Sequence, residues 1–251
     1  MREALLVIGH RGSAGTAPEN TLPSFAAAAD GGADMIELDV RLTADGELVV
    51  HHDMSLWRTA GLRRRIQELT AAEITRLDAG TWFARRYRGT TVPALASVLA
   101  WRPANLGVNI EVKTAGDSRG SSAYVRPLLK LVDRVPGPRL LVSSFDDAFL
   151  ALLRREAPAL SLGCLYLPVR DRVRGPAGLA RATGARVFIC SARQGRPALV
   201  GEARATGLDV FVYGVNAVHP ARSVRALGVN GIITDVPARL RRSLNRTGCS
   251  L

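Results

Sequence analysis

The sequence is poor in aromatic residues and cysteine, and it has no long hydrophobic run. Aromatic residues form only 5% of the chain and do not alternate with basic ones, which argues against a stacking platform for single-stranded nucleic acid. The cysteines have no CxxC spacing, and Cys164 and Cys190 lie in apolar runs, so we expect buried thiols in a reducing compartment. No segment approaches the length of a membrane span, and the apolar stretch near the start is too short for a signal peptide. These absences predict a cytoplasmic protein with no stable insertion in a membrane.

Positive charge, by contrast, is abundant. Lysine and arginine total 34 against 22 acidic residues, which gives a net charge of +12, and only Lys113 and Lys130 are lysines. Such an excess suits an anionic small molecule, a nucleic acid or an acidic membrane surface. The arginines are scattered, however, except for Arg63–Arg65 and a basic tail formed by Arg239, Arg241, Arg242 and Arg246. We therefore expect a solvated basic surface and no nucleic-acid partner, whereas the sequence leaves the oligomeric state open.

Short apolar runs alternate with helical patterns along the chain, and this order predicts a parallel sheet. Because the length suits one α/β barrel, we predict a single (β/α)₈ TIM-barrel domain over residues 1–251. The eight expected strands are Leu5–Gly9, Asp34–Val40, Gly107–Val112, Arg139–Ser143, Ser161–Leu165, Arg186–Cys190, Asp209–Gly214 and Gly231–Thr234. The expected helices include Pro23–Asp30, Ala123–Arg134, Asp147–Glu156, Pro197–Ala205, Pro220–Leu227 and Pro237–Leu244.

The connection after the second strand is unusually long. Residues 53–92 separate this strand from the helix before the third, and a loop of that length is expected to be functional or to carry its own structure. Ala44–Gly46 predicts a hairpin turn that extends the second strand. Thr70 followed by Glu73 predicts a capping box that opens a short helix. We interpret 53–92 as a small inserted segment over the top of the barrel and not as a second domain.

Two carboxylates stand within an apolar strand. Glu37 and Asp39 are two positions apart, so the period of a strand directs both to one face, and Glu111 repeats this pattern in the third strand. Carboxylates aimed into a core repel each other and are costly to desolvate unless a cation compensates. A salt-bridged pair near the surface is the alternative, but the apolar flanks favour metal binding. Three carboxylates without a cysteine ligand favour Mg²⁺ or Ca²⁺ over Zn²⁺, and the choice between those two stays open.

Histidines and a lysine stand near the ends of the same strands, where barrel enzymes gather their catalytic groups. His10 directly follows the first strand, and His51 and His52 close the strand after the hairpin. Because adjacent strand residues face opposite ways, only one of these two histidines can face the metal site, and the pattern does not say which. Two histidines above a dication suggest general acid and base catalysis on a phosphate ester. Lys113, on the face of Glu111, either meets a phosphate oxygen or balances the acids.

Several short motifs follow one another in a fixed order. They are His10-Arg-Gly, Pro18-Glu-Asn-Thr21, Glu37-Leu-Asp39, His52-Asp53, Glu111-Val-Lys113, Gly80-Thr-Trp-Phe83, Val92-Pro-Ala-Leu95, Ser144-Phe-Asp146 and the ending Gly228–Asp235 with Pro237. Each alone is weak evidence, but the first two are specific in combination. In order and spacing the motifs resemble the glycerophosphodiester phosphodiesterase family, and the match covers nearly the whole chain.

The resemblance implies a barrel enzyme that hydrolyses glycerophosphodiesters, its small-molecule substrates, to sn-glycerol 3-phosphate and an alcohol with the help of a divalent cation. It does not say which histidine is the acid, nor whether water or the glycerol 2-hydroxyl attacks the phosphate. Tyr213 stands where the family often has tryptophan, so the alcohol side of the pocket is expected to differ. The implied roles are acid–base catalysis for His10 and His52, metal binding for Glu37, Asp39 and Glu111, phosphate binding for Arg11 and Lys113, and an aromatic wall for Tyr213.

Two other functions are weighed against this one. A lysophospholipase D acting on lipids with one acyl chain would need an apolar rim at the barrel mouth. Trp57, Trp82 and Phe83 offer apolar side chains in the inserted segment, but we expect them to form a small core beneath it. A catalytically inactive barrel that binds polyanions is disfavoured, because a pure binder has no need for paired histidines and acids.

Overall fold

Eight parallel strands close into a barrel in the computed structural model, which describes residues 5–115, 117, 119–133 and 139–246. The sheet runs from β1 through β9, β8, β7, β6, β5 and β4 to β2, and β1 pairs back to β2 to complete the ring. The predicted barrel is thus confirmed, and each strand lies within two residues of its predicted bounds. The strands are β1 (Leu6–Gly9), β2 (Met35–Leu42), β4 (Gly107–Val112), β5 (Leu140–Ser144), β6 (Ser161–Leu165), β7 (Val187–Ser191), β8 (Asp209–Tyr213) and β9 (Gly231–Thr234).

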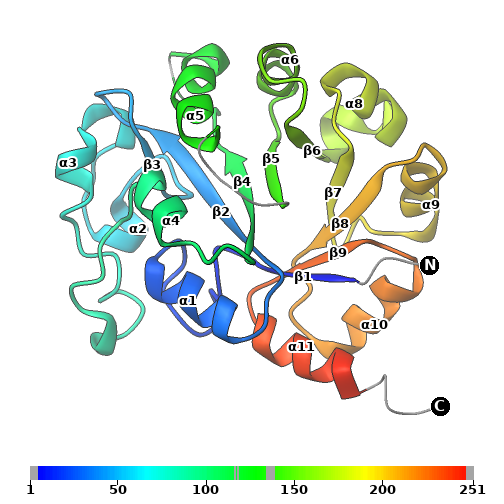
Figure 1. Cartoon of the computed structure of the whole chain (residues 1–251), viewed down its shortest axis with the longest axis horizontal. Helices are drawn as coiled ribbons and strands as arrows, with labels where there is room; N and C mark the ends of the chain where they lie inside the picture. The colour runs from blue at the N-terminus through cyan, green and yellow to red at the C-terminus, as the bar shows by residue number, and fades with distance from the viewer. Residues whose placement is uncertain (1–4, 116, 118, 134–138, 247–251) are drawn as a thin grey trace.

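Helices surround the barrel and are joined to its strands by short loops (Figure 1). The longer ones are α1 (Leu22–Asp30), α4 (Leu95–Trp101), α5 (Val125–Val132), α6 (Asp147–Glu156), α8 (Gly175–Thr183), α9 (Pro197–Ala205), α10 (Val218–Ala226) and α11 (Pro237–Arg246). The predicted helix Ala123–Arg134 begins as the 3₁₀ turn η3 (Ser121–Tyr124) and continues as α5, while Arg134 lies outside the described residues. None of the described helices combines the length and the hydropathy needed to cross a bilayer.

Alternating strand residues build two separate apolar cores. Outward residues such as Ile36 and Leu38 pack against the helices, whereas inward residues such as Ile8, Ile189 and Phe211 fill the barrel interior. Burying each such side chain contributes about 1.5–3 kcal/mol, so the ring is stabilised from both faces. The predicted buried thiols, Cys164 and Cys190, are buried and unpaired, and Cys249 lies outside the described residues.

The inserted segment, residues 53–92, follows the predicted hairpin and lies beside it at one side of the barrel (Figure 1). Strand β3 (Leu48–Val50) pairs antiparallel with β2, and Thr70 caps α3 (Ala71–Ile74) through the predicted capping box with Glu73. The remaining short elements are α2 (Trp57–Ala60), η1 (Ile66–Glu68) and η2 (Arg85–Tyr87).

The prediction that Trp57, Trp82 and Phe83 form a core beneath this segment is wrong. Aliphatic side chains, among them Leu56 and Ile66, form the core of this segment against β3, and none of the three aromatic residues belongs to it. Trp57 is 52% exposed and Trp82 is 42% exposed. The guanidinium of Arg63 lies 4.4 Å from the centre of the Trp57 ring, so this tryptophan is covered in part by a cation and not by a core.

Candidate active site

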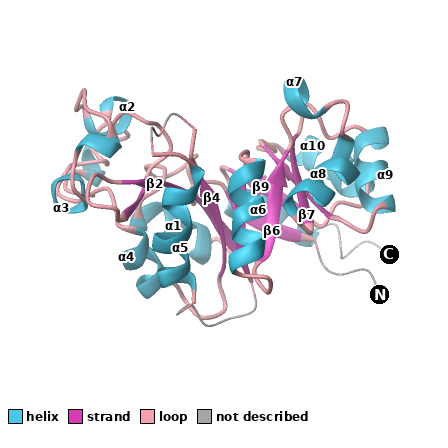
Figure 2. Ribbon diagram, turned by 90° about the horizontal axis from the view of Figure 1, so that it is seen from above, coloured by secondary structure: helices cyan, strands magenta, loops and turns pink. Residues whose placement is uncertain are grey.

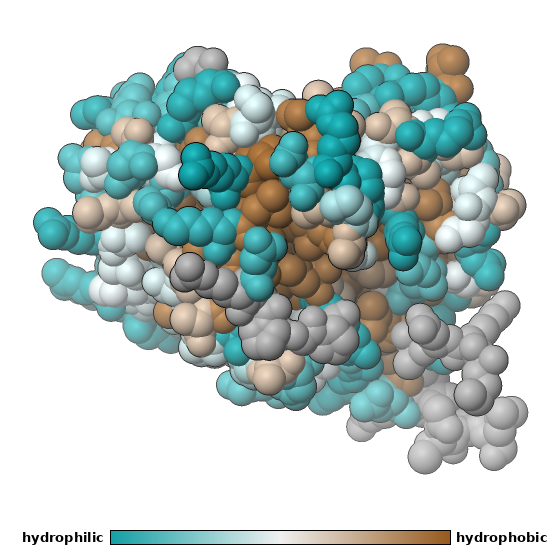
Figure 3. Space-filling model, turned by 45° about the horizontal axis from the view of Figure 1, so that its top comes forward, coloured by the Kyte–Doolittle hydropathy of each residue, from teal (hydrophilic) through white to brown (hydrophobic). Residues whose placement is uncertain are grey.

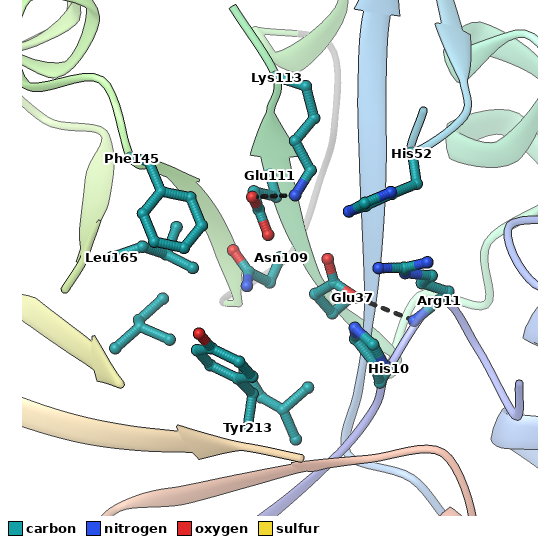
Figure 4. A pocket seen from close by; sticks show the side chains of 12 residues that line it. His10, Arg11, Glu37, His52, Asn109, Glu111, Lys113, Phe145, Leu165 and Tyr213 are labelled. Carbon is teal, nitrogen blue, oxygen red and sulfur yellow. Dashed lines mark hydrogen bonds and ion pairs between the residues drawn. The ribbon is translucent and has the colours of Figure 1, made fainter. Parts of the chain in front are cut away.

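A cavity opens at the carboxyl ends of the barrel strands, the end at which such barrels place catalytic groups. Its walls differ in chemistry: charged and polar side chains gather on one side and apolar ones on the other (Figure 4). The space-filling view is taken from another side of the molecule, where polar surface residues surround a central apolar patch (Figure 3). The lining residues are His10, Arg11, Glu37, His52, Asn109, Glu111, Lys113, Phe145, Leu165, Ile189, Tyr213 and Ile233.

The three acids predicted as metal ligands come together because of the register between β2 and β4. Glu37 lies opposite Asn109, and Asp39 lies opposite Glu111, so the inward positions of the two strands form adjacent rows. One carboxylate oxygen from each of Glu37, Asp39 and Glu111 lies within 4.8 Å of the others. All three side chains are buried, and Asp39 lies behind the other two without lining the cavity.

Burial and mutual repulsion act on these carboxyls unequally. Burial, followed by the charge of Asp39, raises the pKa of Glu37, and burial also raises the pKa of Glu111. Burial acts in the same sense on Asp39, but the cations Lys113 and Arg11 outweigh it and hold its pKa well below the ordinary value. The charged form of Asp39 is therefore stabilised in the folded protein, whereas the charged forms of Glu37 and Glu111 are disfavoured.

Glu37 supplies a direct test of whether the site fits a metal ion. Its Oε2 accepts a hydrogen bond from the backbone N–H of Arg11 at 2.8 Å, whereas its Oε1 is buried with no hydrogen-bond partner among the described residues. A buried carboxylate oxygen without a partner is costly unless another group satisfies it. Three converging carboxylates form a hard oxygen donor set, so the residues fit a divalent cation of the Mg²⁺ or Ca²⁺ type.

Both cations expected to bind phosphate are held by these acids. Lys113 pairs with Glu111, and its Nζ also lies 3.1 Å from an oxygen of Asp39. The Nε of Arg11 lies 3.2 Å from Asp39, and its Nη1 donates to Glu19 at 2.8 Å. Lys113 thus balances the acids, one of the two roles that the sequence allows for it.

His10 and Asp235 form a pair across the seam of the barrel. His10 follows β1 and Asp235 follows β9, and the Nδ1 of the histidine lies 2.6 Å from a carboxylate oxygen of Asp235. Asn216 also donates to this carboxylate, which fixes it from the other side. Burial lowers the pKa of His10, but the hydrogen bond with Asp235 and the charge of Glu37 together raise it above the ordinary value.

The structure places His52, and not His51, on the cavity wall. The Nδ1 of His52 lies 2.7 Å from a carboxylate oxygen of Asp53, so this imidazole has an acidic partner as His10 does. His51 faces the inserted segment, where its ring nitrogens lie 2.8 Å from Thr59 Oγ1 and 2.9 Å from the carbonyl oxygen of Asp53. Burial lowers the pKa of His52, so the two cavity histidines are shifted in opposite directions.

Arg58, from α2 of the inserted segment, connects these groups although it does not line the cavity. It donates to both oxygens of Glu19 at 2.7 and 2.8 Å, and its Nε donates to Asp53 at 2.7 Å. Because Glu19 holds Arg11 and Asp53 holds His52, one guanidinium supports two cavity side chains at once. Such bidentate pairs are stronger and more directional than single ion pairs.

Each of the first two motifs contains a residue with a left-handed backbone conformation. Arg11 has φ +50° and Asn20 has φ +57°, and the N–H of Asn20 donates to the carbonyl of Arg11. The Asn20 amide donates to Asp39 at 2.8 Å and accepts from the Asp39 backbone at 3.2 Å. Gly12 also has positive φ, and a Cβ there would lie 2.6 Å from the backbone of Ser24. Local strain of this kind is typical of functional sites.

The charged residues of the cavity and Tyr213 were predicted from the sequence, but the apolar wall residues Phe145, Leu165, Ile189 and Ile233 and the partners of the charged groups were not. Asp235, Asp53, Glu19 and Asn20 all stand inside the quoted motifs, yet no role followed from those motifs alone. Arg58 stands outside them. For Asp53 the sequence offered a signal, because it directly follows the cavity residue His52.

Comparisons with known proteins place the chain in a family. A model of the glycerophosphoryl diester phosphodiesterase family matches residues 10–239. A glycerophosphodiester phosphodiesterase of Bacillus altitudinis is 32% identical over 241 residues, which cover 93% of this chain and 95% of that protein. The crystal structure of a glycerophosphodiester phosphodiesterase from Agrobacterium tumefaciens matches with a TM-score of 0.76 and 31% identity, and the match covers 94% of this chain and 99% of that one.

A second solved structure shows a bound product. A phosphodiesterase of Oleispira antarctica, in complex with the product sn-glycerol-3-phosphate, matches with a TM-score of 0.86 and 26% identity over 96% of both chains. The family model spans most of the sequence, and the relatives are covered almost entirely. This chain therefore belongs to the glycerophosphoryl diester phosphodiesterase family, and it is an enzyme that hydrolyses phosphodiesters.

Proposed function

We propose that this enzyme hydrolyses small glycerophosphodiesters to sn-glycerol 3-phosphate and an alcohol, with a divalent cation held by Glu37, Asp39 and Glu111 and with His10 and His52 as the proton-transferring pair. The observation that carries the proposal is the meeting of both histidines and the buried acids in one cavity. The product named for the Oleispira antarctica relative supports the choice of substrate class.

A cation bound by Glu37, Asp39 and Glu111 would supply positive charge to stabilise the negative charge that develops on the phosphate oxygens. Glu37, with its unpartnered Oε1, is the ligand whose satisfaction depends most on that ion. Asp39 and Glu111 keep Lys113 beside the ligand cluster, so its charge adds to the field that receives a phosphate. Arg11 presents its guanidinium to the same cavity for a directional contact.

The histidines are suited to opposite proton transfers. Each has its Nδ1 against a carboxylate, Asp235 for His10 and Asp53 for His52, which leaves each Nε2 for the reacting oxygens. One imidazole removes a proton from the attacking oxygen and the other protonates the leaving alcohol. Their pKa values move apart, upward for His10 and downward for His52, as a working acid and base require.

The apolar wall provides a place for the uncharged parts of the substrate. Tyr213 lies across the cavity from Lys113 and Arg11, and Phe145 lies on the same wall nearer to Lys113, whose Nζ is 5.9 Å from the centre of its ring (Figure 4). An aromatic face packs well against the carbon atoms of a glycerol or of the alcohol group while the phosphate meets the cations. We propose that Tyr213 limits the size of the group accepted on this side.

Release of glycerol 3-phosphate from glycerophosphocholine and glycerophosphoethanolamine tests the reaction. We expect release that stops when EDTA is added and returns when Mg²⁺ or Ca²⁺ is restored, because the carboxylate cluster is charged and incomplete without a cation. Enzyme-coupled detection of the product gives the rate. Full activity in EDTA would contradict the metal assignment, and no release with any cation would contradict the substrate class.

Alanine at Arg58 is expected to lower kcat about tenfold with a smaller effect on KM, which is the scale of losing a side chain that orients catalytic groups. Lysine there should restore only part of the activity, because a single ammonium cannot hold Glu19 and Asp53 together. The pH dependence of kcat should also shift, since Asp53 is the partner of His52. Arg63→Ala, an exposed arginine of the same segment, is the matched control. Equal losses for the two alanine variants would remove this role from Arg58.

A further inference from the structure

A second apolar feature lies beside the mouth of the cavity, in the loop that follows β6. Here the side chains of Val169 and Val173 are 97% and 96% exposed, and Leu167 is 42% exposed. Isolated surface aliphatics are common, but fully exposed ones grouped in one short segment usually mark a surface that meets a partner. This segment, residues 167–174, includes the short helix α7 (Pro168–Asp171) and is called the α7 rim below.

The α7 rim is held in place by a buried carboxylate. Asp171 is fully buried, accepts a hydrogen bond from the N–H of Leu167 at 2.7 Å and pairs with Arg170 and Arg174. Arg170 also donates to the carbonyl oxygen of Phe145, a residue of the cavity wall. The segment that carries Val169 and Val173 is therefore held in place by hydrogen bonds and ion pairs. Packing within the described chain does not offset the free-energy cost of exposing these two side chains to water.

The rim lies at the end of the molecule where the cavity opens. It begins two residues after Leu165, which lines the cavity. Figure 2 shows α7 and α2 rising on opposite sides of the same end of the barrel. Figure 3 shows apolar atoms protruding at the upper right, on the side where Figure 2 places α7. A flat surface that touched the valines would thus face the cavity mouth.

The charge around the valines is positive on balance, although the exposed Glu202 lies beside Gly175 at the end of the rim. Asp171 is the only acid of the rim and is buried, and Arg170 and Arg174 are paired with it and with Asp147. The excess charge comes from exposed Arg172 and from exposed Arg193 in the loop after the neighbouring strand β7. Aliphatic tips beside arginines match the boundary of an anionic bilayer, where the side chain enters the interface and the cation meets lipid phosphates. The net charge of +12 adds a long-range attraction to the same surface.

We propose that the α7 rim docks this enzyme reversibly on an anionic membrane surface, with Val169 and Val173 entering the interface and Arg172 meeting lipid headgroup phosphates. The docking would bring the cavity close to diesters formed from membrane lipids, and only this consequence rests on the proposed function. The binding itself is independent of catalysis.

Co-sedimentation of the full chain with vesicles tests the proposal. The vesicles are made of phosphatidylcholine alone or of phosphatidylcholine mixed with phosphatidylglycerol. We expect binding to the mixed vesicles that weakens with added salt. The double change Val169→Ser and Val173→Ser should weaken it at least about tenfold through lost apolar burial. Arg172→Ala should weaken it about fivefold, the effect of one arginine near an anionic surface.

Arg126→Ala is the matched control, because it removes the same charge from an exposed position on α5, outside the α7 rim. It should change binding much less than Arg172→Ala does. Hydrolysis of glycerophosphocholine, measured in parallel, should have the same rate in all variants. If the wild-type protein does not hydrolyse this diester, the result counts against the proposed function and does not affect the test of docking.

Failure of the wild type to bind mixed vesicles would overturn the proposal, as would binding that the serine pair leaves unchanged. Equal losses for Arg172→Ala and Arg126→Ala would show that overall charge and not the rim attracts the membrane. A dimer that the serine pair dissociates, seen by analytical ultracentrifugation without vesicle binding, would assign the rim to a second copy of this chain instead.

Discussion

Alanine at His52 is expected to lower kcat by about 10²–10⁴, and alanine at His10 by a similar factor, because each removes one of two proton transfers. The cavity places both imidazoles beside the buried acids, and each has a carboxylate that orients it. Neither variant removes a metal ligand, so the metal concentration for half-maximal activity should stay close to that of the wild type. Steady-state rates on glycerophosphocholine over a metal titration measure both quantities.

His219→Ala is the control for these two variants, since His219 is exposed on α10 and does not line the cavity. It should keep wild-type turnover. Near-normal turnover in either His10→Ala or His52→Ala would remove that residue from the acid–base pair. An activated substrate with a good leaving group separates the roles further, because it should rescue the variant that lacks the acid more than the one that lacks the base.

Glutamine at Glu37 is expected to have opposite effects on metal use and on stability. The change removes a charged ligand, so the concentration of Mg²⁺ or Ca²⁺ for half-maximal activity should rise by at least about tenfold. In the presence of EDTA the same change should stabilise the protein by about 1–3 kcal/mol, because it removes a buried charge beside Asp39 and Glu111. Glu37 is chosen because its buried Oε1 has no hydrogen-bond partner among the described residues.

The sign of the stability effect follows from the raised pKa of Glu37. A carboxyl whose pKa is raised on folding favours the folded state when protonated, and this advantage is lost as the pH rises above its ordinary range. The stability gain of the glutamine variant should therefore be small in acid and larger at neutral and higher pH. Thermal unfolding in EDTA across that range measures it, with Glu47→Gln on the exposed hairpin as the control. A destabilised variant with an unchanged metal requirement would contradict both the ligand role and the electrostatic argument.

The barrel and the inward acids follow from local pattern. Apolar runs that alternate with helical segments already predict where each strand lies, because strand and helix periodicity is decided by neighbours in the chain. The spacing of Glu37 and Asp39 likewise directs both to one face of β2 before any other strand is known. Membership in the family follows from the motifs, which lie in the sequence itself, and the comparisons confirm it.

Contacts across the closed ring were not accessible in this way. Asp235 meets His10 across 225 positions of the chain, because β1 and β9 become neighbours only when the barrel closes. The choice of His52 over His51 depends on how the hairpin meets β2 and on the segment that receives His51 at Thr59. The composition does not predict which apolar residues are exposed. In the inserted segment aliphatic side chains form the core and the tryptophans are exposed. In the α7 rim, buried Asp171 holds the segment while Val169 and Val173 are exposed. Periodicity decides which face a side chain takes, but only the packing of distant segments decides what that face meets.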